Sequence, residues 1–162
     1  MDIQKRRSLM MHTRTTGFTL VELISIMIII GILAVVALPR FFDRSTFEAR
    51  AFSDQTLAIL RYAQKAAIAQ RRTVCVTFTS TTVSLTIAAA AGTNTCGANP
   101  PLLGPGGENP YQITAKSNIS FSATPATFYF TSLGQASVTQ TIQVLGAPDS
   151  ITVERETGYV HT

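Results

Sequence analysis

Cysteine and histidine are scarce in this sequence: its 162 residues contain two of each. Two thiols, Cys75 and Cys96, with only His12 and His161 to join them, make a poor zinc site, so we expect no metal. His12 stands in a basic N-terminal stretch and His161 is the penultimate residue, so neither is placed as a general base in a core. The sequence therefore predicts no enzyme, no metal centre and no cofactor.

Other chemical motifs are missing as well. The glycines of residues 104–107 are not followed by the lysine and hydroxyl residue that complete a phosphate-binding loop. Glu154 and Glu156 stand near the end of an expected strand, where a solvated edge explains them without catalysis. The chain offers no convincing active site.

Positive charge is concentrated at the N-terminus. Residues 1–17 carry four basic side chains against Asp2 alone, whereas nine basic and eight acidic residues follow from Phe18 onward. A basic leader of this kind is typical of the cytoplasmic side of a membrane segment. The rest of the chain is almost neutral and lacks the clustered lysines and arginines that DNA binding requires.

The pairing of the two cysteines depends on the compartment. In an exported domain, Cys75 and Cys96 can form a disulfide, which would close a loop and contribute about 3 kcal/mol. In a reducing compartment, two buried thiols are the simpler interpretation.

A long apolar segment follows the leader. Residues 18–39 contain one ionisable side chain, Glu22, and as a helix they would extend about 33 Å, enough to span a hydrocarbon core. A secretory signal peptide cut after Ala37 and a plain signal anchor are alternatives, but neither explains the carboxylate of Glu22, which is costly near lipid without a partner. A lipoprotein signal is not favoured, because no cysteine follows the apolar run. Gly31 and Pro39 lie within it, as membrane helices tolerate.

The residues at the start of this segment, Thr16-Gly17-Phe18-Thr19-Leu20-Val21-Glu22, resemble the N-terminal processing motif of type IV prepilins. The resemblance implies cleavage between Gly17 and Phe18, N-methylation of Phe18, and pairing of Glu22 with the terminal amine of a neighbouring subunit. Each charge is costly alone in an apolar surrounding, so such a pair would set the register of the subunits. The partners implied are other pilin subunits, the prepilin peptidase and methyltransferase, the inner-membrane assembly platform and, before assembly, membrane lipid.

An amphipathic helix is expected next. Its apolar positions recur at helical spacing on one face, and we expect residues further along the chain to pack against this face and bury it. The helix should end near residues 70–72, where Arg71 and Arg72 suit the negative end of the helix dipole. Ser53, Gln55 and Gln64 are assigned to the polar surface. The apolar face consists of Phe52, Thr56, Ile59, Leu60, Ala63, Ala66 and Ala67.

Beyond residue 72 the apolar period changes to two, which predicts strands. A short connection at Ser80-Thr81 suggests a hairpin, and residues 89–107 read as a long loop rich in glycine, proline and alanine. We expect six or seven strands and an α+β fold, with a long N-terminal helix packed on an antiparallel sheet. The expected strands are residues 73–79, 82–88, 119–122, 126–131, 140–145, 151–154 and 157–160.

The C-terminal third carries a second resemblance. Its segments 130–135, 142–144, 151–153 and 158–160 are similar to the end of minor pilins and pseudopilins of the H-type and FimT-like group. The segment 34–42 is also similar to minor pilins of the mannose-sensitive haemagglutinin system. In FimT-like relatives a basic motif after the last glycine implies DNA binding, but here Gly158 is followed by Tyr-Val-His-Thr, which does not favour it.

Together these observations predict four regions: a leader at 1–17, a transmembrane or filament-core helix at 18–39, an amphipathic helix at 40–72 and a β domain at 73–162. The expected function is that of a minor pilin or pseudopilin, anchored in the inner membrane with its domain in the periplasm, then assembled into a type IV pilus or type II secretion filament, where it helps to prime assembly. The alternatives are a pilin that binds DNA or a surface ligand through residues 89–107 or a sheet edge, and a singly anchored periplasmic domain.

Overall fold

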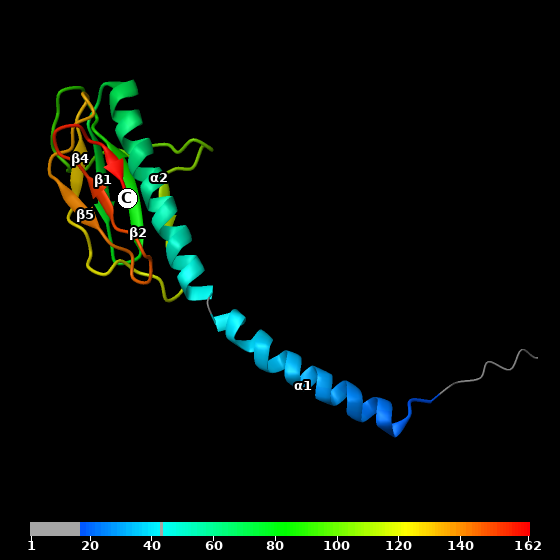
Figure 1. The fold of residues 1–162 in the computed structure, drawn as a ribbon. Coiled ribbons are helices and arrows are strands. Elements are labelled where there is room, and N and C mark those ends of the chain that lie inside the picture. Colours follow the sequence, from blue (N-terminus) through cyan, green and yellow to red (C-terminus); the bar gives the residue numbers. More distant parts are fainter. Residues whose placement is uncertain (1–16, 43) are drawn as a thin grey trace, which may run out of the picture. The chain divides into compact units, whose positions relative to one another are not determined.

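The computed structural model describes residues 17–42 and 44–162, with the backbone alone at residues 36–42 and 44. Nearly all of the predicted leader, including its basic residues and His12, lies outside the described part of the chain. The chain divides into two units, the first ending at Phe41 and the second running from Phe42 to Thr162 (Figure 1).

The described part of the first unit is nearly all helix α1, Leu20–Phe42, whose last residue already belongs to the second unit. The helix contains both Gly31 and Pro39. Among the residues that the structure describes, no helix combines the length and the apolar character needed to cross a membrane.

The second unit begins with helix α2, Arg44–Gln70. The predicted end near residue 70 is confirmed. Residue 43, between α1 and α2, lies outside the described residues, so the structure does not show whether one helix runs through it. All seven residues of the predicted apolar face are at most 8% exposed. Ser53 was wrongly assigned to the polar surface, since it borders this face and is buried.

A tight cap closes the C-terminus of α2. The N–H of Arg72 donates to the carbonyl of Ala67 at 3.1 Å, and the N–H of Arg71 donates to that of Ile68 at 3.2 Å. These two bonds define a Schellman cap, in which Arg71 takes the left-handed position usually filled by glycine, with φ of 51°. The Arg72 side chain also donates to the carbonyl of Ala88, which fixes the helix end to the residue after β2.

The strands form two antiparallel sheets instead of the single sheet that was expected. A four-stranded sheet has the order β3-β2-β1-β4, and a three-stranded sheet has the order β5-β6-β7. The α+β fold class is confirmed. The bounds are β1 Val74–Phe78, β2 Thr82–Ile87, β3 Gln112–Thr114, β4 Phe128–Phe130, β5 Gln140–Ile142, β6 Ile151–Val153 and β7 Val160–His161.

The predicted hairpin joins β1 to β2, with Phe78 opposite Val83. Its turn has no glycine, and the hydroxyl of Thr79 accepts the N–H groups of Thr81 and Thr82 instead. The predicted strand at 119–122 is wrong as an element: Phe121 forms only an isolated bridge to Val144. Strand β3 went unpredicted, because its alternation is only three residues long and its apolar residue, Ile113, is only half-buried.

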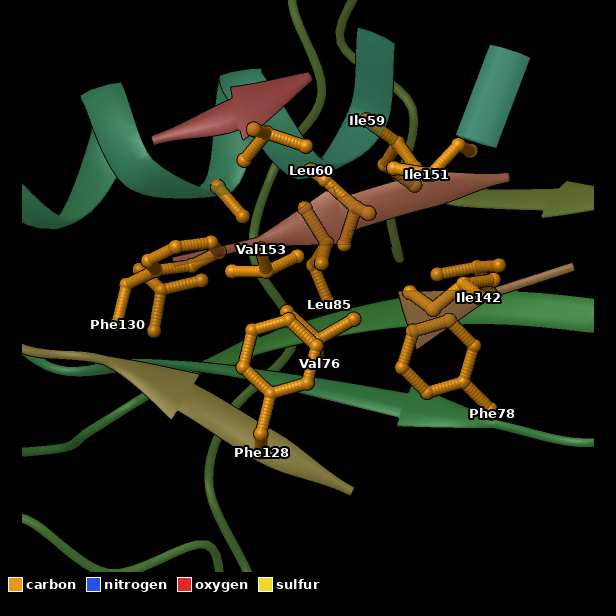
Figure 2. Packing of buried hydrophobic residues seen from close by; sticks show 14 of the residues in the cluster. Ile59, Leu60, Val76, Phe78, Leu85, Phe128, Phe130, Ile142, Ile151 and Val153 are labelled. Carbon is orange, nitrogen blue, oxygen red and sulfur yellow. The ribbon is translucent and has the colours of Figure 1, made fainter. Parts of the chain in front are cut away.

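One core lies between α2 and the two sheets. Figure 2 shows Ile59 and Leu60 of α2 facing side chains that come from both sheets. Helix α2 therefore covers part of the apolar face of each sheet, and residues of the two sheets also face one another in this core. The labelled core residues of the strands are Val76, Phe78, Leu85, Phe128, Phe130, Ile142, Ile151 and Val153.

Candidate functional site

The residues of the predicted processing motif lie at the start of α1. Gly17 and Phe18 precede the helix, and Phe18 is 74% exposed. Thr19 caps the helix: its hydroxyl accepts the N–H of Glu22 at 3.3 Å, and its carbonyl accepts the N–H of Leu23 at 3.1 Å. The helix thus begins two residues after the predicted cleavage point.

Glu22 has a structural role that the sequence analysis missed. It occupies the third position after the Thr19 cap, as in a capping box, and a carboxylate in the first turn also faces the positive end of the helix dipole. The sequence signal was available, since a Thr-x-x-Glu spacing before an apolar run marks a helix start. The carboxylate is exposed, and so remains accessible to a group outside the chain.

The described side chains of α1 share one property. Every residue from Gly17 to Val35 is exposed, and nearly all of them are apolar. Such a surface, apolar on all sides of a helix, is rarely left in water and marks contact with another protein or with lipid.

The structure joins Cys75 and Cys96 in a disulfide, so the disulfide alternative is the one observed. Cys75 lies on β1 and is 1% exposed, whereas Cys96 lies in the long loop. The hydroxyl of Thr73 donates to the side-chain oxygen of Asn94 at 2.8 Å, close to the bridge. The middle of the predicted loop is therefore attached to strand β1.

Near its C-terminal end, that loop also contacts α2. The hydroxyl of Tyr62 donates to the carbonyl of Leu103 at 2.7 Å, and the ring of Tyr62 meets that of Tyr111 edge to face, with centroids 5.0 Å apart. Burial raises the pKa of the Tyr111 phenol, and the nearby Glu108 carboxylate and Tyr62 raise it further. The loop is thus held to β1 through Cys96 and to α2 through Leu103, while most of its side chains stay exposed.

The C-terminal segments that were singled out by resemblance meet at the side of α2. The side-chain amide of Gln64 donates to the carbonyl of Gly134 at 3.1 Å and to that of Thr157 at 3.0 Å. Gly134 and Gly158 both have positive φ, 87° and 64°. In this chain, the turns at Gly134 and Gly158 therefore pack against each other and against the helix.

The last residues carry aromatic and acidic groups rather than a basic motif. The rings of Tyr159 and His161 stack at 5.1 Å, and His161 Nε2 lies 3.4 Å from the carboxylate of Glu154. Across the described residues, no group of three or more histidine, cysteine or acidic side chains is placed to hold a metal ion.

Comparison with known proteins yields one relative in sequence and several in fold. No protein-family model matches the sequence. The type IV narrow pilus major component PilA5 of Thermus thermophilus is 42% identical over 59 residues, which are 36% of this chain and 51% of that protein. This chain therefore matches only about half the length of that relative.

Two solved structures resemble the fold. The minor pseudopilin EpsH from the type II secretion system of Vibrio cholerae is 15% identical, with 72% of this chain and 93% of that chain covered and a TM-score of 0.51. The type IV minor pilin FimU of Pseudomonas aeruginosa is 14% identical, with 68% and 89% covered and a TM-score of 0.46. The predicted resemblance to type IV pilin-like proteins and the predicted α+β pilin fold are confirmed.

Proposed function

We propose that this type IV pilin-like chain is a minor pilin or pseudopilin subunit that is assembled into a type IV pilus or a type II secretion filament. The observation that carries the proposal is the combination at the start of α1: an exposed Gly17-Phe18 junction, one carboxylate at Glu22, and an apolar surface on every side of the helix that follows. A filament core covers such a surface with the same helices of other subunits. The role proposed is structural rather than catalytic.

Processing and localisation follow from the same residues. A prepilin peptidase would cut after Gly17, and a methyltransferase would modify the new amine of Phe18. Residues 18–39 would be held in the inner membrane until the assembly platform transfers them to the filament, and the second unit would lie in the periplasm. Glu22 would pair with the amine of a neighbour and set the register, because either charge alone is costly in an apolar surrounding.

The experiment that tests this proposal is mass spectrometry of sheared surface filaments. A peptide that begins at methylated Phe18, at low copy number relative to the most abundant pilin, is the expected result, and it agrees with a role in priming assembly. A high copy number would instead make the chain a major subunit. Recovery of only uncut protein, or of protein that begins near Leu38, in the cell envelope would support a singly anchored domain and refute the proposal.

A further inference from the structure

A polar hollow of about 200 Å³ lies beside β4, the edge strand of the four-stranded sheet. None of its lining residues belongs to the long loop at 89–107. Side chains from β4, from the turn after it and from the residues after β6 line it. Besides Ala136, the residues that line it are Tyr129, Thr131, Gln135, Ser137, Arg155 and Glu156.

Backbone hydrogen bonds fix the walls of this hollow. The N–H of Ser137 donates to the carbonyl of Tyr129 at 2.9 Å, and the N–H of Tyr129 donates to the Ser137 hydroxyl at 3.2 Å. The N–H of Ala136 donates to the carbonyl of Arg155 at 2.9 Å, which joins the two sheets at this point. These bonds fix the backbone around the hollow, so a ligand would not have to order the main chain, which lowers the entropic cost of binding.

One wall has an unmet hydrogen-bonding group. The hydroxyl oxygen of Thr131 is buried and has no partner among the described residues. A buried hydroxyl without a partner costs about 1–3 kcal/mol, so such groups in folded proteins call for an explanation. Thr131 lines the hollow and is half-buried as a whole, so its occluded hydroxyl would have to change rotamer to bond a ligand there.

The chemistry of the lining defines the class of ligand. Its one cation, Arg155, lies 3.8 Å from the carboxylate of Glu156, so the lining has no net charge and does not favour an anion. Thr131, Ser137, Gln135 and Tyr129 offer groups that both donate and accept hydrogen bonds, and the Tyr129 ring adds an apolar face. A volume of about 200 Å³ somewhat exceeds the roughly 150 Å³ of an engineered protein cavity that binds benzene, so the hollow has room for one six-membered ring.

We propose that this hollow is a binding site for one neutral sugar ring, with its hydroxyl groups bonded to Thr131, Gln135 and Ser137. The proposal does not depend on filament assembly, since every residue in it belongs to the second unit. It also places ligand binding at β4 and not at residues 89–107.

The test uses the full chain in a sugar-free detergent and saturation-transfer difference NMR. The probes are the methyl glycosides of glucose, galactose and N-acetylglucosamine at millimolar concentration, together with methyl glucuronide as a charged analogue. The variant that alters the site is Gln135→Ala with Thr131→Val. Its matched control is Gln112→Ala with Thr114→Val, which makes the same two changes on β3 at the opposite edge of the same sheet.

The expected result is transfer to at least one neutral glycoside, weakened about tenfold or more in the site variant and unchanged in the control. If the double variant unfolds, Gln135→Ala alone is measured instead, because Gln135 is exposed and its replacement should leave the fold intact. Absence of transfer in the wild type, equal transfer in both double variants, or tighter binding of the glucuronide would each overturn the proposal.

Discussion

A Cβ atom on Gly158 would lie 1.8 Å from the main-chain carbonyl oxygen of Gly134. The two glycines stand 24 positions apart, in turns that follow β4 and β6, and Gln64 of α2 bonds to both turns. Gly158 therefore permits the close approach of two backbones as well as a positive φ. This contact joins the turn after β4, the edge strand of the four-stranded sheet, to the turn between β6 and β7 of the three-stranded sheet.

The substitution Gly158→Ala should destabilise the domain strongly. The methyl group clashes with backbone, which cannot move aside as a side-chain end can, and the left-handed φ adds strain. We expect a loss of about 3 kcal/mol or more in the free energy of unfolding, measured by urea denaturation. The control is Gly92→Ala, also at positive φ but with open space around it, for which about 1 kcal/mol is expected. Equal losses would show that conformation, and not the contact, sets the requirement for Gly158.

At Arg71 the opposite change, from a residue with a side chain to glycine, should stabilise the domain. Its φ of 51° strains a residue with a side chain, so Arg71→Gly is expected to stabilise the domain by about 1 kcal/mol relative to Arg71→Ala. The alanine variant removes the guanidinium while it keeps the strain, and so separates the two effects. Thermal unfolding of both variants and the wild type measures the difference. A glycine variant less stable than the alanine variant would contradict the role of Arg71 as a strained cap.

Local patterns in the sequence predicted the parts of this fold that depend on local physics. The buried stripe of α2 from Phe52 to Ala67 and the alternation of Val74, Val76 and Phe78 follow directly from side-chain period and burial. The division into two sheets does not, because it depends on where chain segments meet. Phe121 illustrates the limit: its flanking residues read as a strand, yet it pairs with Val144 at a single bridge.

The same limit applies to the candidate sites. Gly17, Phe18 and Glu22 are consecutive or nearly so, and a motif could identify them. The polar hollow combines Tyr129, Ser137 and Arg155, none of which has a distinctive spacing in the sequence. The contact between Gly134 and Gly158 was not predicted: a resemblance singled out the two segments, but nothing local requires their turns to meet.

Removal of the Cys75–Cys96 bridge should lower the free energy of unfolding by about 3 kcal/mol, because the bond closes a loop with a sequence separation of 21 residues. The double substitution Cys75→Ala with Cys96→Ala and the reduced wild type should behave alike in urea denaturation, apart from a small packing loss at the buried Cys75. If the double variant and the reduced wild type each lose less than about 1 kcal/mol relative to the oxidised wild type, the hydrogen bonds of Asn94 and Asn99 hold the loop without the bridge.

Alkaline pH should destabilise the domain through Tyr111. Burial, Glu108 and Tyr62 raise the pKa of its phenol in the folded state, so the folded chain holds this proton more tightly than the unfolded chain. The resulting stability is complete below the unfolded pKa of about 10 and is lost as pH rises through the folded value. Tyr111→Phe should therefore flatten the fall in melting temperature above pH 10. Tyr159→Phe, which makes the same change at an exposed ring, is the matched control.

Glu22 has two candidate roles, helix capping and subunit register, and three variants separate them. Glu22→Gln keeps a residue that serves a capping box but removes the charge, Glu22→Ala removes both, and Thr19→Val removes the cap hydroxyl alone. If the carboxylate pairs with the terminal amine of a neighbour, both Glu22 variants should be cleaved normally yet enter sheared filaments at least about tenfold less than wild type, while Thr19→Val enters almost normally. Quantitative mass spectrometry of filaments and membranes measures both steps. Normal incorporation of Glu22→Gln, with loss confined to Glu22→Ala and Thr19→Val, would assign Glu22 to the helix cap and refute the register role.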